Sequence, residues 1–278
     1  MKKSGVVSVL ALAVVSLLAL LARTQPAHAG AHYVNPGIKS VLCNGLVEYF
    51  EMDETSDSPR VGAFGTLLNE PVTTNIGTRT GRGGAGTAVA LAGTTSSYLW
   101  KSYSVAPSGF YTIAMWLYAD TAGTPGQFQY VISWDSGTRR GPSIYLYNDM
   151  GTLRVYHQAF ERETGNFSTI SQPLSAGAWH LVVVGMTTYL AGGSNTPSVF
   201  VSVDNAARST NPLGYFTTPG ERQFRIGCHP GNGPTGVCDL PFAGAIDNLA
   251  LWSRALAPNE IGLLSNGGAG QSYPYVTE

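Results

Sequence analysis

The sequence predicts an all-β domain, a sandwich of antiparallel strands with one short helix near its C-terminus. From residue 42 onwards, short apolar runs alternate with clusters of Gly, Pro, Asn, Asp and Ser. This spacing is typical of many short strands joined by turns. Charged residues make up only 12% of the chain, whereas Gly, Ser, Thr, Tyr and Val are plentiful, and such a composition suits strands better than a helical bundle.

The expected strands follow one another without a long linker or a break in composition, so we expect one domain. They lie at residues 46–52, 87–91, 97–103, 111–118, 127–134, 143–148, 153–157, 179–187, 198–204, 223–227 and 242–252. A helix is expected at 258–264, because Pro258 suits the first helical position and Glu260 complements the N-terminal dipole. Ala257 precedes it and offers no side-chain cap, which costs about 1 kcal/mol.

The first 29 residues have the pattern of an export signal. Lys2 and Lys3 precede an apolar run over 6–22, and a small-x-small cleavage site follows at 27–29. The alternative is an uncleaved membrane anchor, since the run is about as long as the shortest spanning helices. We therefore divide the chain into a signal peptide (1–29), a lead-in (30–41), the β domain (42–266) and a tail (267–278). Cleavage leaves no membrane span and predicts a secreted or cell-surface protein.

The charge of the mature chain excludes nucleic acid as a partner. The whole chain has 16 Lys and Arg against 17 Asp and Glu. Residues 1–29 hold three of the basic residues and no acidic one, which leaves 13 against 17, a net charge of −4. No basic stripe or charge run interrupts the sequence, and nucleic-acid-binding proteins need one.

Cys228 and Cys238 bracket a Gly- and Pro-rich loop and are expected to form a disulfide in an oxidising compartment. The closed loop is short, so the chain-entropy model gives a stabilisation of about 2–3 kcal/mol. Cys43 is then left over, either as a buried thiol or as one half of an intermolecular bridge. The spacing also leaves open a bond between Cys43 and either of the other two.

Seven stretches of the chain carry a further pattern, in a fixed order. They are 45–54 (GLVEYFEMDE), 81–93 (GRGGAGTAVALAG), 110–117 (FYTIAMWL), 179–184 (WHLVVV), 202–205 (SVDN), 224–227 (FRIG) and 242–247 (FAGAID). In this order they resemble the strands of the LamG-like jelly roll, within the concanavalin A-like lectin/glucanase superfamily. The resemblance is piecewise but covers most of the mature chain, and it implies a two-sheet antiparallel jelly-roll sandwich. Asn205 departs from it, because the family usually has glycine at that turn.

The resemblance also raises calcium as a cofactor, because many members of the superfamily bind it at the rim of the sandwich. The acidic residues near neighbouring strand ends are Asp53, Glu54, Asp57 and Asp247, and carboxylate oxygens are the ligands that calcium prefers. Asp247 lies within an apolar strand, so its carboxylate needs a definite partner. The alternative to calcium is that Asp247 accepts main-chain or arginine hydrogen bonds and ties the first and last strands together.

Catalysis is not expected, although the superfamily includes glucanases. Retaining glycosidases need two carboxyl groups about 5–5.5 Å apart, and strands supply them at alternate positions. Glu51 and Asp53 come close to this pattern, but position 55 is Thr, and the cluster stands where non-catalytic relatives carry Asp-Glu. Strands 111–118 and 127–134 contain no acidic residue.

Aromatic and polar residues on the middle strands suggest a sugar-binding surface instead. Tyr145 and Tyr147 share a face of one strand, and Arg154 and Tyr156 share a face of the next. Gln129 is expected on a polar face of the preceding strand. Rings stack on the faces of sugars while amide and guanidinium groups bind hydroxyls. The alternative is that these tyrosines reflect only the preference of tyrosine for strands.

These observations predict a secreted, non-catalytic recognition or adhesion module whose partner is a glycan or a component of the cell surface or matrix. A self-assembling structural protein of the cell surface or extracellular matrix is the alternative, with copies of the chain as its partners. A glucanase-type glycoside hydrolase ranks third.

Overall fold

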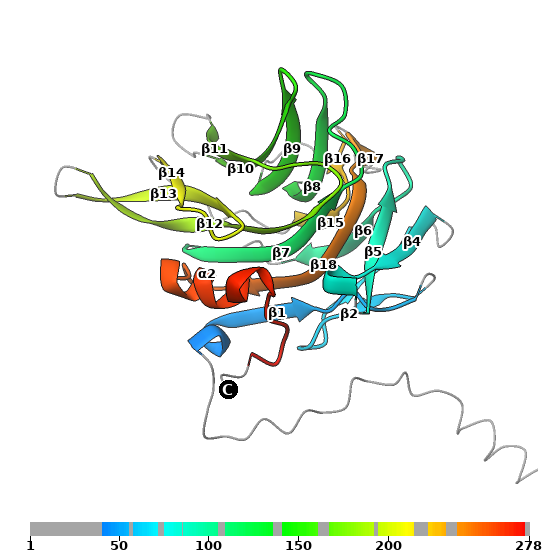
Figure 1. Cartoon of the computed structure of the whole chain (residues 1–278), viewed down its shortest axis with the longest axis horizontal. Helices are drawn as coiled ribbons and strands as arrows, with labels where there is room; N and C mark the ends of the chain where they lie inside the picture. The colour runs from blue at the N-terminus through cyan, green and yellow to red at the C-terminus, as the bar shows by residue number, and fades with distance from the viewer. Residues whose placement is uncertain are drawn as a thin grey trace, which may run out of the picture. The chain divides into compact units, whose positions relative to one another are not determined.

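The computed structural model describes residues 41–55, 58–71, 75–84, 86–104, 109–135, 141–160, 167–191, 194–213, 222–231 and 238–275. These residues form two antiparallel sheets packed face to face, with one short helix on the outside (Figure 1). The predicted all-β jelly-roll sandwich with a C-terminal helix is therefore confirmed. The signal peptide and nearly all of the lead-in lie outside the described residues, as does Asp57.

One sheet has eight strands and the other has six. The eight-stranded sheet runs β14 (Ser209–Pro212), β13 (Ser194–Val203), β12 (Trp179–Ala191), β7 (Tyr111–Ala119), β18 (Ala243–Trp252), β5 (Thr87–Ala92), β4 (Ile76–Thr80), with β1 (Leu46–Phe50) also paired to β18. The six-stranded sheet runs β11 (Phe167–Pro173), β10 (Thr152–Phe160), β9 (Ser143–Asp149), β8 (Phe128–Asp135), β15 (Arg222–Ile226), β6 (Leu99–Ser104).

Short elements complete the fold. Two small hairpins are formed by β2 (Arg60–Val61) with β3 (Leu67–Leu68) and by β16 (His229–Pro230) with β17 (Cys238–Asp239). The helical turns are η1 (Val41–Cys43), η3 (Arg82–Gly84) and η4 (Asn266–Gly268), and the α-helix is α2 (Pro258–Ser265).

The main core lies between the two sheets, because alternate residues of each strand point inward. Ile113 and Met115 of β7 belong to the same buried cluster as Ile144 and Leu146 of β9. Trp134 of β8 belongs to the same cluster. The opposite faces of the strands in the six-stranded sheet are left for solvent, and this is where the candidate ligand surface lies.

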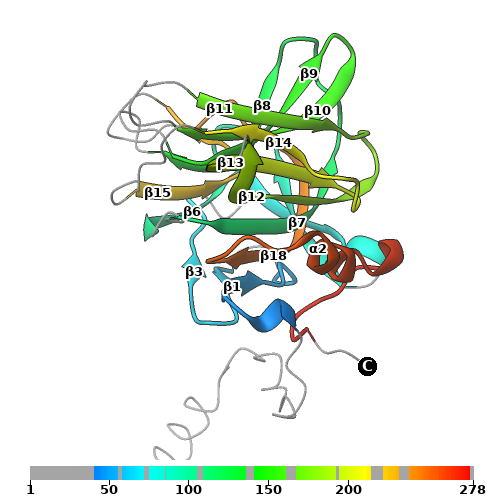
Figure 2. The ribbon, with the colours of Figure 1, turned by 90° about the vertical axis from the view of Figure 1, so that its left-hand side faces the viewer.

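A second apolar cluster lies on the outer side of the eight-stranded sheet, under α2 and the tail. Trp252 of β18, Ile261 and Leu264 of α2, and Tyr275 are buried together there. The predicted tail at 267–278 therefore continues onto the sandwich as far as Tyr275. Figure 2 shows α2 beside β18 and below β7.

The first and last strands of the domain pair with each other. Tyr49 of β1 lies opposite Ala250 of β18, and Phe50 lies opposite Leu249. The register of β18 against β7 shifts between Asp247 and Ala250, which marks a β-bulge. Asn248, inside this bulge, has φ of 51°, a conformation that Asn adopts more readily than most residues. The Asp-Asn interruption in the apolar sequence is thus a bend in the closing strand.

The turn after β13 needs no glycine. Asp204 and Asn205 have φ of 50° and 61°, the left-handed pair that a two-residue type I′ turn requires. The Ala206 N–H donates to the Val203 carbonyl across the turn at 2.9 Å. Asn205 therefore substitutes for the usual glycine at small conformational cost.

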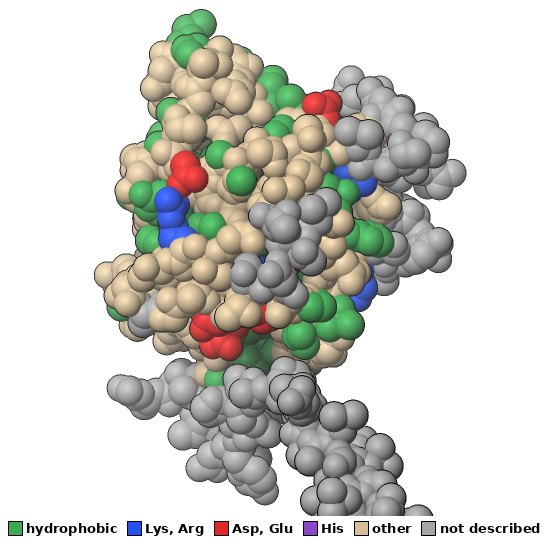
Figure 3. All heavy atoms as spheres, turned by 90° about the vertical axis from the view of Figure 1, so that its right-hand side faces the viewer, with side chains coloured by type: hydrophobic (Ala, Val, Ile, Leu, Met, Phe, Trp, Pro, Cys, Tyr) green, Lys and Arg blue, Asp and Glu red, His purple; other side chains and the backbone are tan. Residues whose placement is uncertain are grey.

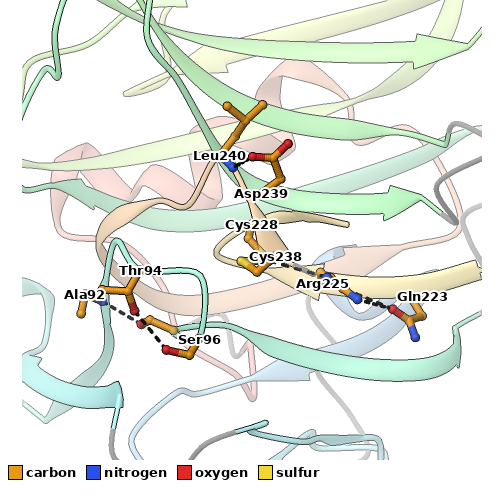
Figure 4. Close-up of a disulfide and its surroundings, with 10 residues drawn as sticks. Ala92, Thr94, Ser96, Gln223, Arg225, Cys228, Cys238, Asp239 and Leu240 are labelled. Carbon is orange, nitrogen blue, oxygen red and sulfur yellow. Dashed lines mark hydrogen bonds between the residues drawn. A yellow bond between two sulfur atoms is a disulfide. The ribbon is translucent and has the colours of Figure 1, made fainter. Parts of the chain in front are cut away.

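The disulfide between Cys228 and Cys238 is present, with their Cα atoms 5.6 Å apart (Figure 4). The bond joins Cys228, which directly precedes β16, to Cys238, the first residue of β17. It therefore holds the small hairpin beside the end of β15. Cys43 takes no part in it and is partly buried, with its thiol 3.7 Å from the Tyr275 carbonyl.

Candidate functional site

The solvent face of β8, β9 and β10 carries a cluster that we call the aromatic face. Its members are Phe128, Tyr130, Tyr145, Tyr147, Arg154, Tyr156 and His229. Alternation places them there, because Leu146 and Val155 on the same strands point into the core. The prediction that Tyr145 shares a face with Tyr147, and Arg154 with Tyr156, agrees with this arrangement.

The strand register sorts the aromatic face into two rows that cross the sheet. In one row Tyr130, Tyr145 and Tyr156 lie directly opposite one another on successive strands. In the next row Phe128 lies opposite Tyr147, which lies opposite Arg154. Neighbouring strands in a sheet are about 4.8 Å apart, so each row spans roughly 10 Å. A flat ligand of a few rings could therefore lie along a row.

The rings of the aromatic face pack against one another. Tyr145 and Tyr156 are stacked, with centroids 5.2 Å apart and planes inclined by 3°. Phe128 lies 4.6 Å from Tyr147, and Tyr147 meets Tyr156 edge-on at 6.0 Å. Phe128 is 38% exposed, whereas Tyr145 is 7% exposed and supports its neighbours from below. Such mutual packing fixes the rings before any ligand arrives, which lowers the entropy cost of binding.

Burial also keeps the phenol of Tyr145 neutral. Its pKa lies well above the ordinary value, first because the group is buried and then because Tyr130, Tyr156 and Tyr147 surround it. Tyr145 therefore offers a hydroxyl group, which can donate and accept, rather than a phenolate charge.

Two polar groups border the rows. Arg154 is partly exposed, and its Nε donates to Ser171 Oγ on β11 at 3.0 Å. His229 of β16 lies against Tyr130 with ring centroids 4.7 Å apart. The disulfide next to His229 holds this histidine beside the end of the tyrosine row.

Gln129 does not belong to the aromatic face, and its predicted placement there is wrong. Its neighbours Phe128 and Tyr130 point outward, so Gln129 points into the sandwich and is 3% exposed. Its Oε1 accepts from the Ala243 N–H of β18 at 3.2 Å. The side chain thus links the two sheets.

Phe128, Tyr130 and His229 were not predicted as members of the surface. The alternation of Phe128 and Tyr130 around Gln129 was visible in the sequence and indicates one strand face. The register that sets them opposite Tyr147 and Tyr145 was not visible, because it depends on the pairing of β8 with β9. His229 reaches the surface only through the fold of the disulfide hairpin.

The acidic residues proposed for calcium are divided between two places. Asp53 follows β1 and accepts the Thr87 N–H at 2.8 Å, next to Asp247 of β18. Glu54 accepts the Val61 N–H at 2.7 Å and faces the buried Arg60. Over the described residues, no group of three or more His, Cys, Asp or Glu side chains could hold a metal ion. Calcium therefore stays a prediction.

Asp247 fastens η3 to the closing strand. Its Oδ2 accepts the Arg82 N–H at 2.9 Å, and its Oδ1 accepts the Asn248 side-chain amide at 2.7 Å. Burial raises the pKa of Asp247 to about 6; the Arg82 N–H opposes this rise, and the nearby carboxylate of Asp53 adds to it. The expected main-chain partner of Asp247 is thus present, but it ties β18 to the β4–β5 turn rather than to β1.

Arg82 extends this junction to the C-terminal segment. Its guanidinium lies 4.2 Å above the Trp116 ring and donates to the Gly268 carbonyl at 2.6 Å. Asp53, Asp247 and Arg82 therefore form a structural junction, in which each side chain already has a partner. The aromatic face is the better candidate for a ligand.

Two face-to-face antiparallel sheets, closed by pairing of the first and last strands, define a concanavalin A-like β-sandwich. The chain belongs to the concanavalin A-like lectin/glucanases superfamily, since a laminin G-type model of that superfamily matches residues 91–262. The family and fold expected from the seven sequence stretches are thus confirmed. No curated protein matches the sequence.

Solved structures with a similar fold come from larger proteins. Domain 4 of an extracellular GH43 arabinanase from Geobacillus stearothermophilus, in complex with arabinotriose, has a TM-score of 0.53 and 15% identity. The match covers 78% of this chain and 96% of that domain. The binding domain of botulinum neurotoxin serotype D/C has a TM-score of 0.57 and 12% identity. That match covers 80% of this chain but 52% of the toxin domain, so the chain spans about half of its length.

A botulinum neurotoxin type C structure, described as dependent on two ganglioside molecules for cell entry, matches with a TM-score of 0.57 and 10% identity over 80% of this chain and 51% of the toxin chain. At these identities the likeness concerns the fold.

Across the described residues, no helix combines the length and apolar character that crossing a bilayer requires.

Proposed function

We propose that this chain is an exported, non-catalytic recognition module that binds carbohydrate on the aromatic face. The observation that carries the proposal is the pair of aromatic rows on the solvent side of β8, β9 and β10. Aromatic side chains in a sheet are common, but a soluble domain buries most of them or scatters them singly. Here five rings lie together on the outer face of one sheet.

The chemistry of the aromatic face suits a sugar better than an apolar ligand. Ring faces supply apolar area, while the tyrosine hydroxyls and Arg154 supply hydrogen bonds at the edges. The face that is turned to the viewer in Figure 3 bears only a few scattered charged side chains, in keeping with the low charge of the chain.

The relatives support the proposal at the level of what the fold can host. The arabinanase domain was solved with arabinotriose, and the neurotoxin type C work concerns gangliosides. A carbohydrate-binding role for this fold is therefore well represented. The position of the site is argued from this chain alone.

A glycan array probed with the mature protein tests the proposal, followed by calorimetry on the strongest ligand. Tyr147→Ala and Phe128→Ala each remove an exposed ring and should weaken binding roughly tenfold, about 1–2 kcal/mol per ring. Phe110→Ala is the matched control, because Phe110 is an exposed aromatic residue (42%) preceding β7, away from the aromatic face. Equal affinities for all four proteins, or silence across the array, would contradict the proposal.

Self-association is the second candidate function, and one surface favours it. Val61, Phe64 and Leu67, on and beside the β2–β3 hairpin, are exposed apolar side chains, with Phe64 55% and Leu67 48% exposed. Grouped apolar side chains on a soluble domain often mark a contact with another molecule. In this case, copies of the chain would meet through the hairpin, and the aromatic face would take no part.

A further inference from the structure

We propose that the aromatic face selects saccharides that carry a carboxylate, and that Arg154 is the residue that reads it. This inference rests on the proposed carbohydrate-binding function and specifies its ligand class. Arg154 ends the row that begins with Phe128 and Tyr147, so a sugar stacked on those rings would bring its next substituent to the guanidinium.

Arg154 is held in place on one side only. Its Nε donates to Ser171 Oγ on the neighbouring strand β11 at 3.0 Å. The two terminal amino groups form no hydrogen bond with another described residue. A guanidinium anchored through Nε presents these two groups side by side, the geometry that matches the two oxygens of a carboxylate.

The charge of Arg154 is not balanced within the described part of the protein. Three other arginines have a carboxylate close by: Arg60 and Glu70 lie 3.0 Å apart, Arg79 and Asp120 2.6 Å, and Arg254 and Glu260 2.6 Å. Within the described residues no acidic side chain comes within 4 Å of Arg154.

The nearest acidic residue along the strands does not fill this role. Asp149 is exposed at the end of β9 and lies opposite Thr152, two residues along the strands from the Tyr147–Arg154 pair. Arg154 instead lies next to the stacked rings with its charge unpaired among the described residues. A neutral sugar would cover the guanidinium without pairing its charge, which is unfavourable. A carboxylated sugar would pair with it.

The test compares a panel of uronic- and sialic-acid-containing glycans with the same glycans after chemical reduction of their carboxyl groups. The wild-type mature protein should bind the acidic forms at least tenfold more tightly than the reduced forms. Arg154→Gln should abolish this preference and leave the affinity for the reduced forms. Arg154→Lys should keep part of it, because an ammonium retains the charge but lacks the two-pronged geometry.

Two further variants separate recognition from general charge and from folding. Arg79→Gln changes the net charge equally but lies on β4 of the other sheet, and it should keep the full preference. Ser171→Ala should reduce the preference several-fold without removing any charge, because Ser171 acts by positioning Arg154. A loss in Arg79→Gln equal to that in Arg154→Gln would show that overall charge is responsible, and would overturn the inference.

The outcomes also separate this inference from the proposed function. Equal binding of acidic and reduced glycans, both weakened by Tyr147→Ala, would overturn the role of Arg154 and leave the carbohydrate site standing. An absence of binding to either form would overturn both. A preference for acidic glycans that survives Arg154→Gln would place the charge recognition elsewhere.

Discussion

His157 is a titratable side chain placed in the middle of the core. It is fully buried, and its Nε2 lies 2.9 Å from the Tyr111 hydroxyl. Burial lowers its pKa from 6.5 to about 3, so the folded protein keeps the imidazole neutral. The unfolded chain takes up a proton as the pH falls below 6.5, and the folded chain does so only near 3. The stability from this group is therefore present above pH 6.5 and is lost as the pH falls towards 3.

His157→Gln tests this pH dependence. The amide keeps a polar partner for Tyr111 but does not titrate, so the variant should be somewhat less stable at pH 7. Its free energy of unfolding should fall less steeply between pH 6.5 and 4, by up to about 1.4 kcal/mol per pH unit. Urea unfolding at several pH values measures both slopes. Parallel curves for the two proteins would show that His157 is not protonated on unfolding.

Asp247 should act in the opposite direction. Its pKa is raised from 3.8 to about 6, mainly by burial, so ionisation at neutral pH opposes folding. The stability attached to its neutral form is complete below pH 3.8 and is lost as the pH rises through 6. Asp247→Asn keeps an acceptor for the Arg82 N–H. Relative to wild type, the variant should gain up to about 3 kcal/mol between pH 4 and 7.

Calcium offers a direct contrast at the same residue. A bound calcium ion would stabilise the ionised carboxylate, so added calcium would raise the melting temperature of the wild type and a chelator would lower it. The hydrogen bonds of Asp247 favour its structural role, and we expect the melting temperature to be unchanged by either addition. A calcium-dependent shift that Asp247→Asn removes would establish the metal site instead.

The disulfide is the element whose contribution is easiest to isolate. Cys228→Ser with Cys238→Ser should lower the free energy of unfolding by about 2–3 kcal/mol, because the unfolded chain regains the freedom of a short loop. Denaturant unfolding with and without a reducing agent measures this. Reduced wild type should match the double variant, and Cys43→Ser should still respond to the reducing agent. A double variant as stable as the oxidised wild type would contradict the expectation.

Elements with strong apolar patterns were predictable, and weakly patterned ones were not. Strand β7 is rich in apolar residues and almost entirely buried, and its predicted range of 111–118 ends one residue before the observed strand does. Strand β4 was missed because its sequence, IGTRT, has a single large apolar residue. Strand β11 (FSTISQP) was missed because Phe167 and Ile170 are its only large apolar residues. Ser168 donates to the Pro212 carbonyl of β14, and the Thr169 carbonyl accepts from the Asn211 side chain. Such strands form because their neighbours need partners.

Helix α2 shows a similar compensation at its start. Ala257 gives no side-chain cap, as expected from the sequence. Glu260 instead accepts the Ala257 N–H at 2.6 Å and pairs with Arg254 through both carboxylate oxygens. The hydrogen bonds from Arg254 are the first cause that lowers the pKa of Glu260. The start of the helix could be predicted from the sequence. The capping role of Glu260 could not, because Arg254, which holds its carboxylate in place, lies outside the helix.

At the scale of the whole molecule, the oligomeric state tests the self-association alternative. Phe64→Ser removes the most exposed ring of the β2–β3 hairpin, while Phe128→Ser removes an exposed ring of the aromatic face. If copies meet through the hairpin, sedimentation velocity should show a concentration-dependent dimer that Phe64→Ser weakens and Phe128→Ser preserves. A monomer at all concentrations would exclude self-association through the hairpin, and recognition would remain as the proposed function.

The fold as a whole was more predictable than its candidate site. Seven short stretches in order were enough to indicate the sandwich, because the strongly apolar strands and their order follow from the sequence. The aromatic face needed the register of β8, β9 and β10, which no single stretch contains. Gln129 shows the cost of this gap, since one position along a strand moves a side chain from solvent to the core.

The two ends of the domain are fastened together. Trp252 donates to the Leu42 carbonyl at 2.7 Å, Arg254 donates to the Val41 carbonyl at 2.9 Å, and Cys43 lies beside Tyr275. In both Figures 1 and 2 this junction lies at the opposite end of the sandwich from β8, β9 and β10. A bead, a fluorescent protein or a neighbouring domain attached at either end would therefore point away from the aromatic face. The domain could therefore be immobilised or fused through either of its ends while the aromatic face stays accessible.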